Sequence, residues 1–178
     1  MKFLIASDLH GSAFYTDKLL ERFREENADK LILLGDIYNH GPRNPLPEEY
    51  NPQKVASMLN GIKEKLIVIK GNCDSQVDTM ISEFSFIEDA VIVSGSKTVF
   101  CTHGHVYNRD NLPATAFDAV IYGHFHTGFI ENEKGAIVAN AGSVSLPKNG
   151  TKNSYLILED EKLTLKDIDG KVIDSKNL

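Results

Sequence analysis

Residues 2–10 read KFLIASDLH, an apolar run that ends in the polar motif Asp8-Leu9-His10. A short run without polar alternation is typical of a strand buried on both faces of a parallel sheet. Two later segments repeat the arrangement: residues 30–36 read KLILLGD, and residues 66–74 read LIVIKGNCD. We therefore expect buried strands at residues 2–7, 30–34 and 66–69, each followed by a polar turn.

Helical periodicity fills the gaps between these strands. Tyr15, Leu19, Leu20 and Phe23 fall at helical spacing, and a second helix is expected to begin near Pro52. This alternation indicates βαβ units and a mostly parallel sheet. Further strands are expected at residues 90–93, 98–102, 119–122, 136–140, 155–158 and 163–168. Turn signals between them predict an antiparallel meander in the C-terminal third.

The composition is that of a globular protein. The chain has 178 residues, of which 42% are apolar and 25% charged, and this suits a single domain over residues 1–178. A net charge of −6 argues against a polymeric nucleic acid as partner. No apolar run reaches the roughly 18 residues of a membrane span, and no signal peptide is recognised. Two cysteines are too few for a disulfide framework, so a cytoplasmic location is expected. The sequence does not decide whether the protein is a monomer or a homo-oligomer.

Two further motifs follow later strands: His103-Gly104-His105 and Gly123-His124-Phe125-His126. Ligands of α/β sheets bind beyond the carboxyl ends of the strands, so the five motifs are expected to converge there. Five of the six histidines lie in these motifs. The sixth, His40, lies in residues 37–51, a long irregular segment with three prolines.

Each motif also has a purely structural alternative. Asp8 could cap the following helix, Asp36 could belong to an ordinary turn, and His103 could be a surface residue or a hydrogen-bonded one rather than a ligand. His124 and His126 are two residues apart, which in extended chain places both on the same side. Seven nitrogen and oxygen donors at five strand ends are hard to obtain by accident, and jointly they favour a site.

The donor types fit two adjacent divalent metal ions. Carboxylate, carboxamide and imidazole together suit Mn²⁺, Fe²⁺, Co²⁺, Ni²⁺ or Zn²⁺ better than Ca²⁺. Asp8 and Asp36 would offset only half of the charge of two such ions. The site would therefore attract an anion and lower the pKa of a bridging water. Two ions about 3.5–4 Å apart suit in-line attack at phosphorus.

The five motifs occur in the order of the calcineurin-like metallophosphoesterases, and the chain resembles this family from residue 3 to about residue 145. The motifs are Asp8-x-His10, Gly35-Asp36, Gly71-Asn72-x-Asp74, His103-Gly104-His105 and Gly123-His124-x-His126. Residues 35–44 (GDIYNHGPRN) and 71–74 (GNCD) are similar in particular to the small bacterial phosphodiesterases of the YfcE type.

The resemblance implies a four-layer α/β/β/α sandwich of two mixed sheets. It also implies a phosphoric diester hydrolase, in which a metal-bridging hydroxide attacks the phosphorus of a small phosphodiester, with Mn²⁺ as the first expectation for both ions. By motif, the first ion is assigned to Asp8, His10 and His126, and the second to Asn72, His103 and His124, while Asp36 bridges them.

Several roles stay open under this resemblance. His105 could contact the phosphate, orient a ligand or be structural. From the long segment, His40 and Arg43 are candidate substrate-binding residues, although Arg43 could simply be solvated. Many family members have histidine after the asparagine of the third motif, as general acid, but this chain has Cys73. The proton donor could be Cys73, His105, His40 or none. The candidate catalytic residues are Asn72, Cys73 and His105.

Other functions are compatible with the same fold. An interaction module is the main alternative, because a eukaryotic trafficking subunit of this fold binds partners through its surface. Here all seven ligand positions retain competent donors, which favours an enzyme. A phosphomonoesterase or a nuclease of the superfamily is also conceivable, but the acidic charge disfavours the nuclease. Residues 41–44 (GPRN) replace the Arg-Gly pair of the protein phosphatases, which argues against that branch.

Overall fold

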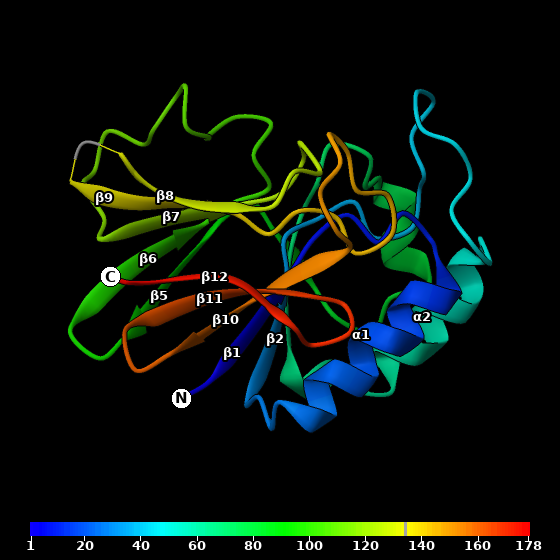
Figure 1. The fold of residues 1–178 in the computed structure, drawn as a ribbon. Coiled ribbons are helices and arrows are strands. Elements are labelled where there is room, and N and C mark those ends of the chain that lie inside the picture. Colours follow the sequence, from blue (N-terminus) through cyan, green and yellow to red (C-terminus); the bar gives the residue numbers. More distant parts are fainter. Residues whose placement is uncertain (134) are drawn as a thin grey trace.

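The computed structural model describes residues 1–133 and 135–178, and two β-sheets that lie face to face form its centre (Figure 1). The strands of the larger sheet are β1 (Phe3–Ala6), β2 (Lys30–Leu33), β3 (Leu66–Ile69), β4 (Phe86–Ile87), β10 (Ser154–Glu159), β11 (Lys162–Asp167) and β12 (Val172–Asn177). Their order is β12-β11-β10-β1-β2-β3-β4. Neighbours from β1 to β4 are parallel, as the βαβ pattern predicts, and β10 pairs antiparallel with β1.

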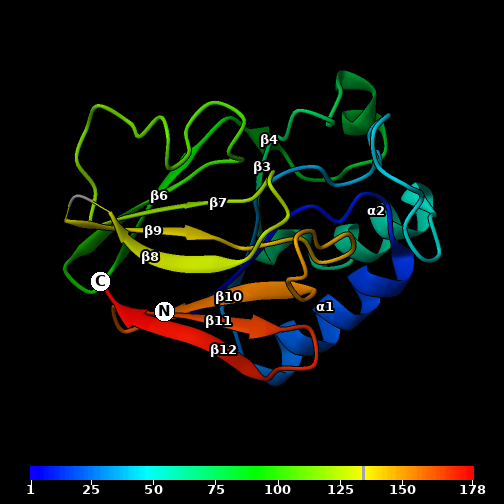
Figure 2. The same cartoon turned by 45° about the horizontal axis from the view of Figure 1, so that its top comes forward.

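The smaller sheet consists of β5 (Ala90–Ser94), β6 (Lys97–Cys101), β7 (Ala119–Tyr122), β8 (Phe129–Glu133) and β9 (Ala136–Asn140). Its order is β5-β6-β7-β9-β8, with β7 parallel to both β6 and β9. The predicted antiparallel meander is therefore wrong for β7 and β9. It holds for β10 and β11, which pair antiparallel in the larger sheet (Figure 2). β12, which was not predicted, extends this meander by pairing antiparallel with β11. A strand pattern specifies which face is buried but not the pairing partner, and this is why the prediction failed.

The two α-helices are α1 (Ala13–Glu25) and α2 (Pro52–Asn60), and two short 3₁₀ helices are η1 (Lys63–Lys65) and η2 (Gln76–Met80). Ser12 caps α1, because its Oγ accepts a hydrogen bond from Tyr15 N at 3.2 Å. This cap excludes the alternative that Asp8 caps the helix. Pro52 opens α2 as predicted, behind the cap residue Asn51. In the described residues, no helix combines the length and apolarity needed to cross a bilayer.

Alternate residues of β1 face two different apolar layers. Leu4 packs with Leu31 into the core between the larger sheet and the helices, whereas Ile5 packs with Ile121 between the two sheets. Full burial of such a side chain stabilises the fold by about 1.5–3 kcal/mol. The two layers thus hold β1 at the centre of the molecule, with its carboxyl end at the junction of the sheets.

The fold class is confirmed as a pair of mixed sheets with few helices. The two outer layers differ, because the helices cover only the larger sheet. Phe100 and Tyr122, on the outer face of the smaller sheet, pack against Tyr107 and Phe117. These two residues belong to the segment 102–118, which is free of helix throughout its described length. A loop therefore forms the fourth layer.

Candidate metal centre

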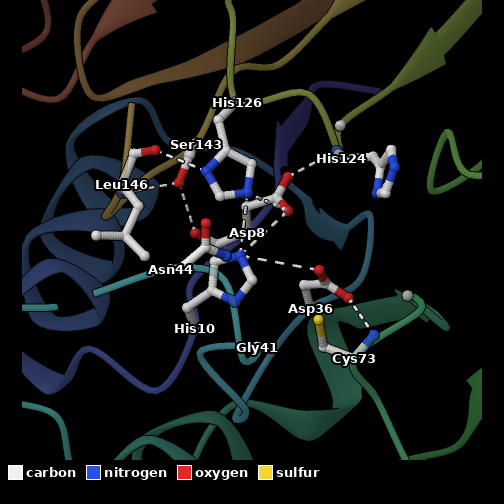
Figure 3. Close-up of polar contacts among 12 residues, drawn as sticks. Asp8, His10, Asp36, Gly41, Asn44, Cys73, His124, His126, Ser143 and Leu146 are labelled. Carbon is white, nitrogen blue, oxygen red and sulfur yellow. Dashed lines mark hydrogen bonds and ion pairs between the residues drawn. The ribbon is translucent and has the colours of Figure 1, made fainter. Parts of the chain in front are cut away.

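The five polar motifs meet where the two sheets adjoin. Figure 3 shows residues of four of them, among them Asp8, Asp36, Cys73 and His126. Three motifs follow β1, β2 and β3 of the larger sheet, and two follow β6 and β7 of the smaller sheet. The predicted convergence is therefore found, and it brings together residues from both sheets. The residues concerned are Asp8, His10, Asp36, Asn72, His103, His124 and His126.

The first cluster consists of Asp8, His10 and His126. The two Nε2 atoms of the histidines are 3.1 Å apart. Asp8 Oδ1 lies 3.5 Å from His10 Nε2 and 3.2 Å from His126 Nε2. All three side chains are buried, so few water molecules can separate these atoms.

Hydrogen bonds fix the tautomers of both rings in this cluster. His10 Nδ1 donates to Asn39 O at 2.7 Å, and His126 Nδ1 donates to Leu146 O at 2.6 Å. A carbonyl oxygen can only accept, so in the neutral rings each Nδ1 holds the hydrogen and each Nε2 presents a lone pair. Asp8 Oδ1, which is buried and accepts no hydrogen bond from the described residues, faces the same point. Lone pairs that converge in this way repel one another unless a cation lies between them.

The second cluster also places nitrogen and oxygen atoms around the lone pair of a histidine, here with a different set of residues. His103 Nδ1 donates to Leu34 O at 2.7 Å, which leaves the lone pair on Nε2. Three further atoms surround this lone pair: Asn72 Oδ1 at 3.0 Å, His124 Nδ1 at 3.3 Å and Asp36 Oδ1 at 3.5 Å. The donors are again nitrogen and oxygen, a set that suits a transition-metal ion.

Asp36 lies between the two clusters and is almost fully buried. Its Oδ2 is 3.8 Å from His10 Nε2, and its Oδ1 is 3.5 Å from His103 Nε2. Each carboxylate oxygen thus faces a different cluster. The backbone N–H of Cys73 donates to Oδ1 at 2.8 Å and helps to fix this orientation.

The charges of the site favour the metal-binding forms of Asp8 and His124. Burial lowers the pKa of His10, but its contacts, foremost those with Asp8, together outweigh burial and raise this pKa. Burial raises the pKa of Asp8, but contacts with His10 and His126 outweigh it and hold this pKa well below its usual value. Burial and the charge of His103 lower the pKa of His124 to about 4, so this ring is neutral at pH 7. An ionised carboxylate and a neutral imidazole are the forms that bind metals.

Hydrogen bonds outside the clusters hold the turns in place. Asp74 accepts backbone hydrogen bonds from Asp36 N at 2.8 Å, Ile37 N at 2.8 Å and Gly71 N at 2.7 Å. Burial raises the pKa of Asp74 to about 6. Because these three donors come from two turns, one carboxylate joins the ends of β2 and β3.

The backbone of the site is constrained to an unusual degree. Positive φ angles of 48–64° occur at Asp8, His10, Asp36, His124 and His126. Residues other than glycine rarely adopt this conformation, and strain of this kind gathers at functional sites. At Gly123, a Cβ atom would overlap the Ser7 hydroxyl and approach Asp8 Oδ2 to 2.7 Å. Only glycine allows these two turns to lie so close together.

A cleft of about 620 Å³ opens beside the clusters. Its walls include Asp36, Asn72, Cys73, Arg43, Phe125 and Lys148. Arg43, for which substrate binding and simple solvation were both open, lies on the wall of this cleft. Cys73 Sγ lies within 4.8 Å of metal-binding atoms of His10 and Asp36, at the edge of the first cluster.

Two predicted residues lie away from the walls of this cleft. His40 packs against Tyr50, with ring centroids 5.3 Å apart, and its buried Nδ1 has no hydrogen-bond partner in the described chain. His105 is exposed, with its ring centroid 5.4 Å from that of His103 and 6.3 Å from that of His124. Of the two, only His105 adjoins a cluster.

Some residues of the site were not predicted from the sequence. Ser143 and Ser145 donate to Asp8 O at 2.8 Å and 3.0 Å and so support the first motif from a distant loop. Lys148 and Phe125 line the cleft. Phe125 lies between two predicted ligands and could have been noticed there, whereas Lys148 and the serines belong to no polar motif at a strand end.

Comparison with known proteins agrees with this geometry. The family model of the calcineurin-like phosphoesterase superfamily domain matches residues 1–162. Phosphodiesterase YfcE of Escherichia coli (strain K12) is 42% identical over 167 residues, which cover 93% of this chain and 91% of the relative.

Solved structures extend the comparison. The structure of E. coli YfcE, described as a phosphoesterase, matches with a TM-score of 0.95 at 39% identity, over 99% of both chains. Vps29 of Entamoeba histolytica, in complex with Zn²⁺, matches with a TM-score of 0.64 at 20% identity over 99% of each chain, a likeness that concerns the fold alone. Since the family model spans most of the sequence and YfcE is so similar, the chain belongs to the calcineurin-like phosphoesterase superfamily.

Proposed function

We propose that the protein is a metal-dependent phosphodiesterase that hydrolyses small phosphodiesters. One observation supports this above all: two clusters of nitrogen and oxygen atoms converge, three of their ring nitrogens present lone pairs, and Asp36 faces both clusters. The similarity to a protein named Phosphodiesterase YfcE supports the substrate class. Phosphodiesters are anions, and a site with two divalent ions would attract them.

The proposed ligands follow the two clusters. Asp8, His10 and His126 would hold one ion, and Asn72, His103 and His124 the other, with Asp36 shared between them. Mn²⁺ is the proposed metal, and Fe²⁺, Co²⁺, Ni²⁺ and Zn²⁺ fit the same donors. When bound, the ions would polarise the phosphoryl group and lower the pKa of a water molecule.

Other residues of the chain would bind and orient the substrate. Arg43 lies on the cleft wall, where its guanidinium can pair with a phosphoryl oxygen. Lys148 adds a second positive charge to this wall. His105 adjoins the second cluster and could contact the leaving group. The overall charge of −6 favours a small substrate over a nucleic acid polymer.

The interaction module is the weaker alternative. A surface that only binds a protein partner does not require buried carboxylates beside three imidazoles of fixed tautomer, or strained backbone at five of the seven positions. We also propose that residues 1–178 form one domain, since the two sheets share a common apolar core. A cytoplasmic location is proposed because Cys73 and Cys101 are both free thiols.

A substrate screen with added Mn²⁺ tests the proposed function. Bis(p-nitrophenyl) phosphate should be hydrolysed faster than p-nitrophenyl phosphate, because a cleft of about 620 Å³ has room for a second ester group. Release of p-nitrophenolate gives both rates. A preference for the monoester would instead indicate a phosphomonoesterase, and no hydrolysis of either compound would favour the interaction module.

We expect Cys73→Ala to cost less than about tenfold in kcat on activated aryl diesters. A positioned general acid contributes roughly 10²–10⁴-fold, but a thiol is a weaker acid than an imidazole. Without ions, burial and then the charge of Asp36 raise the pKa of Cys73 to about 12. Two bound cations would instead favour the thiolate, which has no proton to donate, so Cys73 is a poor acid in either state. Without an effective acid, the rate should depend steeply on the pKa of the leaving group.

A series of aryl and alkyl diesters measures this dependence. Cys73→His should speed the hydrolysis of diesters with poor leaving groups, provided that the imidazole fits beside Gly41. The space there is narrow, because a Cβ atom added to Gly41 would lie only 3.1 Å from Cys73 Sγ. A flat series, together with a large loss in Cys73→Ala, would show instead that Cys73 is the acid.

A further inference from the structure

Phe125 occupies an unusual place for a large apolar residue. It lies between the proposed ligands His124 and His126, lines the cleft and is 45% exposed. Single exposed apolar residues are common on protein surfaces and need no explanation. An aromatic ring on the wall of a site for a charged substrate is different, because it offers apolar surface where phosphate chemistry requires none.

Two aromatic neighbours pack against the ring of Phe125. The ring centroid of His124 is 5.0 Å away at an interplanar angle of 83°, and that of Tyr122 is 6.0 Å away at 78°. Both contacts are T-shaped. In the described chain, no aromatic ring stacks parallel to Phe125, and the residue is partly exposed on the cleft wall, so apolar surface of the ring is open to a planar group there.

The wall around Phe125 also includes unpaired positive charge. Lys148 N donates to His126 O at 2.9 Å, and Asn149 Nδ2 donates to Thr127 Oγ1 at 3.0 Å. These bonds join the loop of Lys148 to the turn of Phe125. Among the ion pairs of the described residues, none involves the side chain of Lys148 or Arg43. An anion with an attached ring could therefore contact both positive charge and an apolar ring on one wall of the cleft.

We infer that Phe125 is a specificity residue, which stacks on a planar ring in an ester group of the substrate. The inference rests on the proposed phosphodiesterase function and narrows its substrate class to diesters with an aryl or nucleoside group. A cleft of about 620 Å³ has room for such a group, since pockets of roughly 300–1,000 Å³ hold ring-containing ligands. Stacking on an aromatic side chain tolerates different rings, so both kinds of diester are included.

Three diesters with the same leaving group test the inference. Each contains p-nitrophenolate, and the second ester group is methyl, phenyl or 5′-thymidyl. In Phe125→Leu, kcat/KM should fall about tenfold more for the phenyl and thymidyl diesters than for the methyl diester, which corresponds to about 1.4 kcal/mol. The intrinsic reactivity of each diester cancels in the variant-to-wild-type ratio. If Phe125→Leu lowers kcat/KM more for one of the two ring-bearing diesters, that diester shows whether an aryl or a nucleoside group is preferred.

Two variants serve as controls. Phe125→Trp keeps an aromatic face and should restore the preference for ring-bearing diesters. Phe14→Leu makes the same change on α1, at a residue that does not line the cleft, and should leave the preference unaltered. Equal losses for all three diesters in Phe125→Leu would indicate a disturbed His124 rather than lost stacking, and would overturn the inference, as would no change at all.

Binding without turnover separates the inference from the proposed function. Calorimetry on the Mn²⁺-loaded protein should give tighter binding of phenylphosphonate than of methylphosphonate, and Phe125→Leu should remove most of the difference. If this difference is found but no diester is hydrolysed, the specificity role stands and the proposed function fails. If diesters are hydrolysed but the two phosphonates bind equally, the function stands and the role of Phe125 is wrong.

Discussion

Removal of divalent metal with a chelator should abolish phosphodiester hydrolysis, and added Mn²⁺ should restore it better than Ca²⁺. The reason is the chemistry of the two clusters, in which the ring nitrogens of His10, His126 and His103 present lone pairs. Ca²⁺ prefers six to eight oxygen ligands, whereas Mn²⁺ accepts this mixture of nitrogen and oxygen. Elemental analysis of the chelated sample and p-nitrophenolate release together give the measurement.

Thermal unfolding provides an independent measurement of metal binding at the two clusters. Without metal, the lone pairs of each cluster face one another in a buried site, so an ion that binds only the folded state should raise Tm. At a free metal concentration of 100 times Kd, this linkage stabilises the fold by about 2.7 kcal/mol. Full activity in a sample shown to be free of metal would contradict the two-ion proposal, and an unchanged Tm on addition of Mn²⁺ would count against binding at these clusters.

The sequence predicted best those features that depend on local pattern. The apolar run ending at Asp8 is β1, the run ending at Asp36 is β2, and Pro52 opens α2. The convergence of the motifs was also predictable, because parallel strands bring their carboxyl ends to one edge of a sheet. Local pattern and known sheet geometry were sufficient for these conclusions.

Features that depend on long-range contacts were not predictable in this way. The pairing of β10 with β1 joins Ile157 to Leu4 across most of the chain, and no local signal specifies it. His124 and His126 were placed on one side by their spacing. Their φ angles of 64° and 60° instead depart from extended chain, and the two rings adjoin different clusters. Such strain is imposed by the surrounding fold, not by the sequence of the turn.

His40 shows a further limit of the sequence. It is four residues from Asp36, but its ring packs against Tyr50 rather than lining the cleft. Lys148 is far from every motif, and the fold brings it to the cleft wall. A residue close to the site in sequence need not line it when the intervening segment is as long and irregular as residues 37–51.

Asp36→Asn should reduce both the metal content and kcat more than Asp8→Asn, although the chemical change is the same. Asp36 presents one oxygen to each cluster, whereas Asp8 Oδ1 faces only His10 and His126. The amide lacks the negative charge, and its NH₂ group cannot be a ligand, so two neighbouring cations would lose both a shared ligand and part of their screening. Loss of an outer partner of a metal ligand typically costs 10–100-fold, and loss of a shared ligand should exceed about 100-fold.

Metal analysis distinguishes the two variants more sharply than kinetics. Asp8→Asn should keep the ion of the second cluster, which Asn72, His103, His124 and Asp36 would hold. Asp36→Asn should weaken the binding of both ions, so its metal content should fall well below two ions per chain. Asp17→Asn, an exposed change on α1, should retain the wild-type metal content and rate. The comparison depends on geometry alone, since all three variants replace one carboxylate by one amide. If Asp36→Asn still binds two ions per chain, Asp36 does not join the clusters, and each must hold its ion with its own terminal ligands.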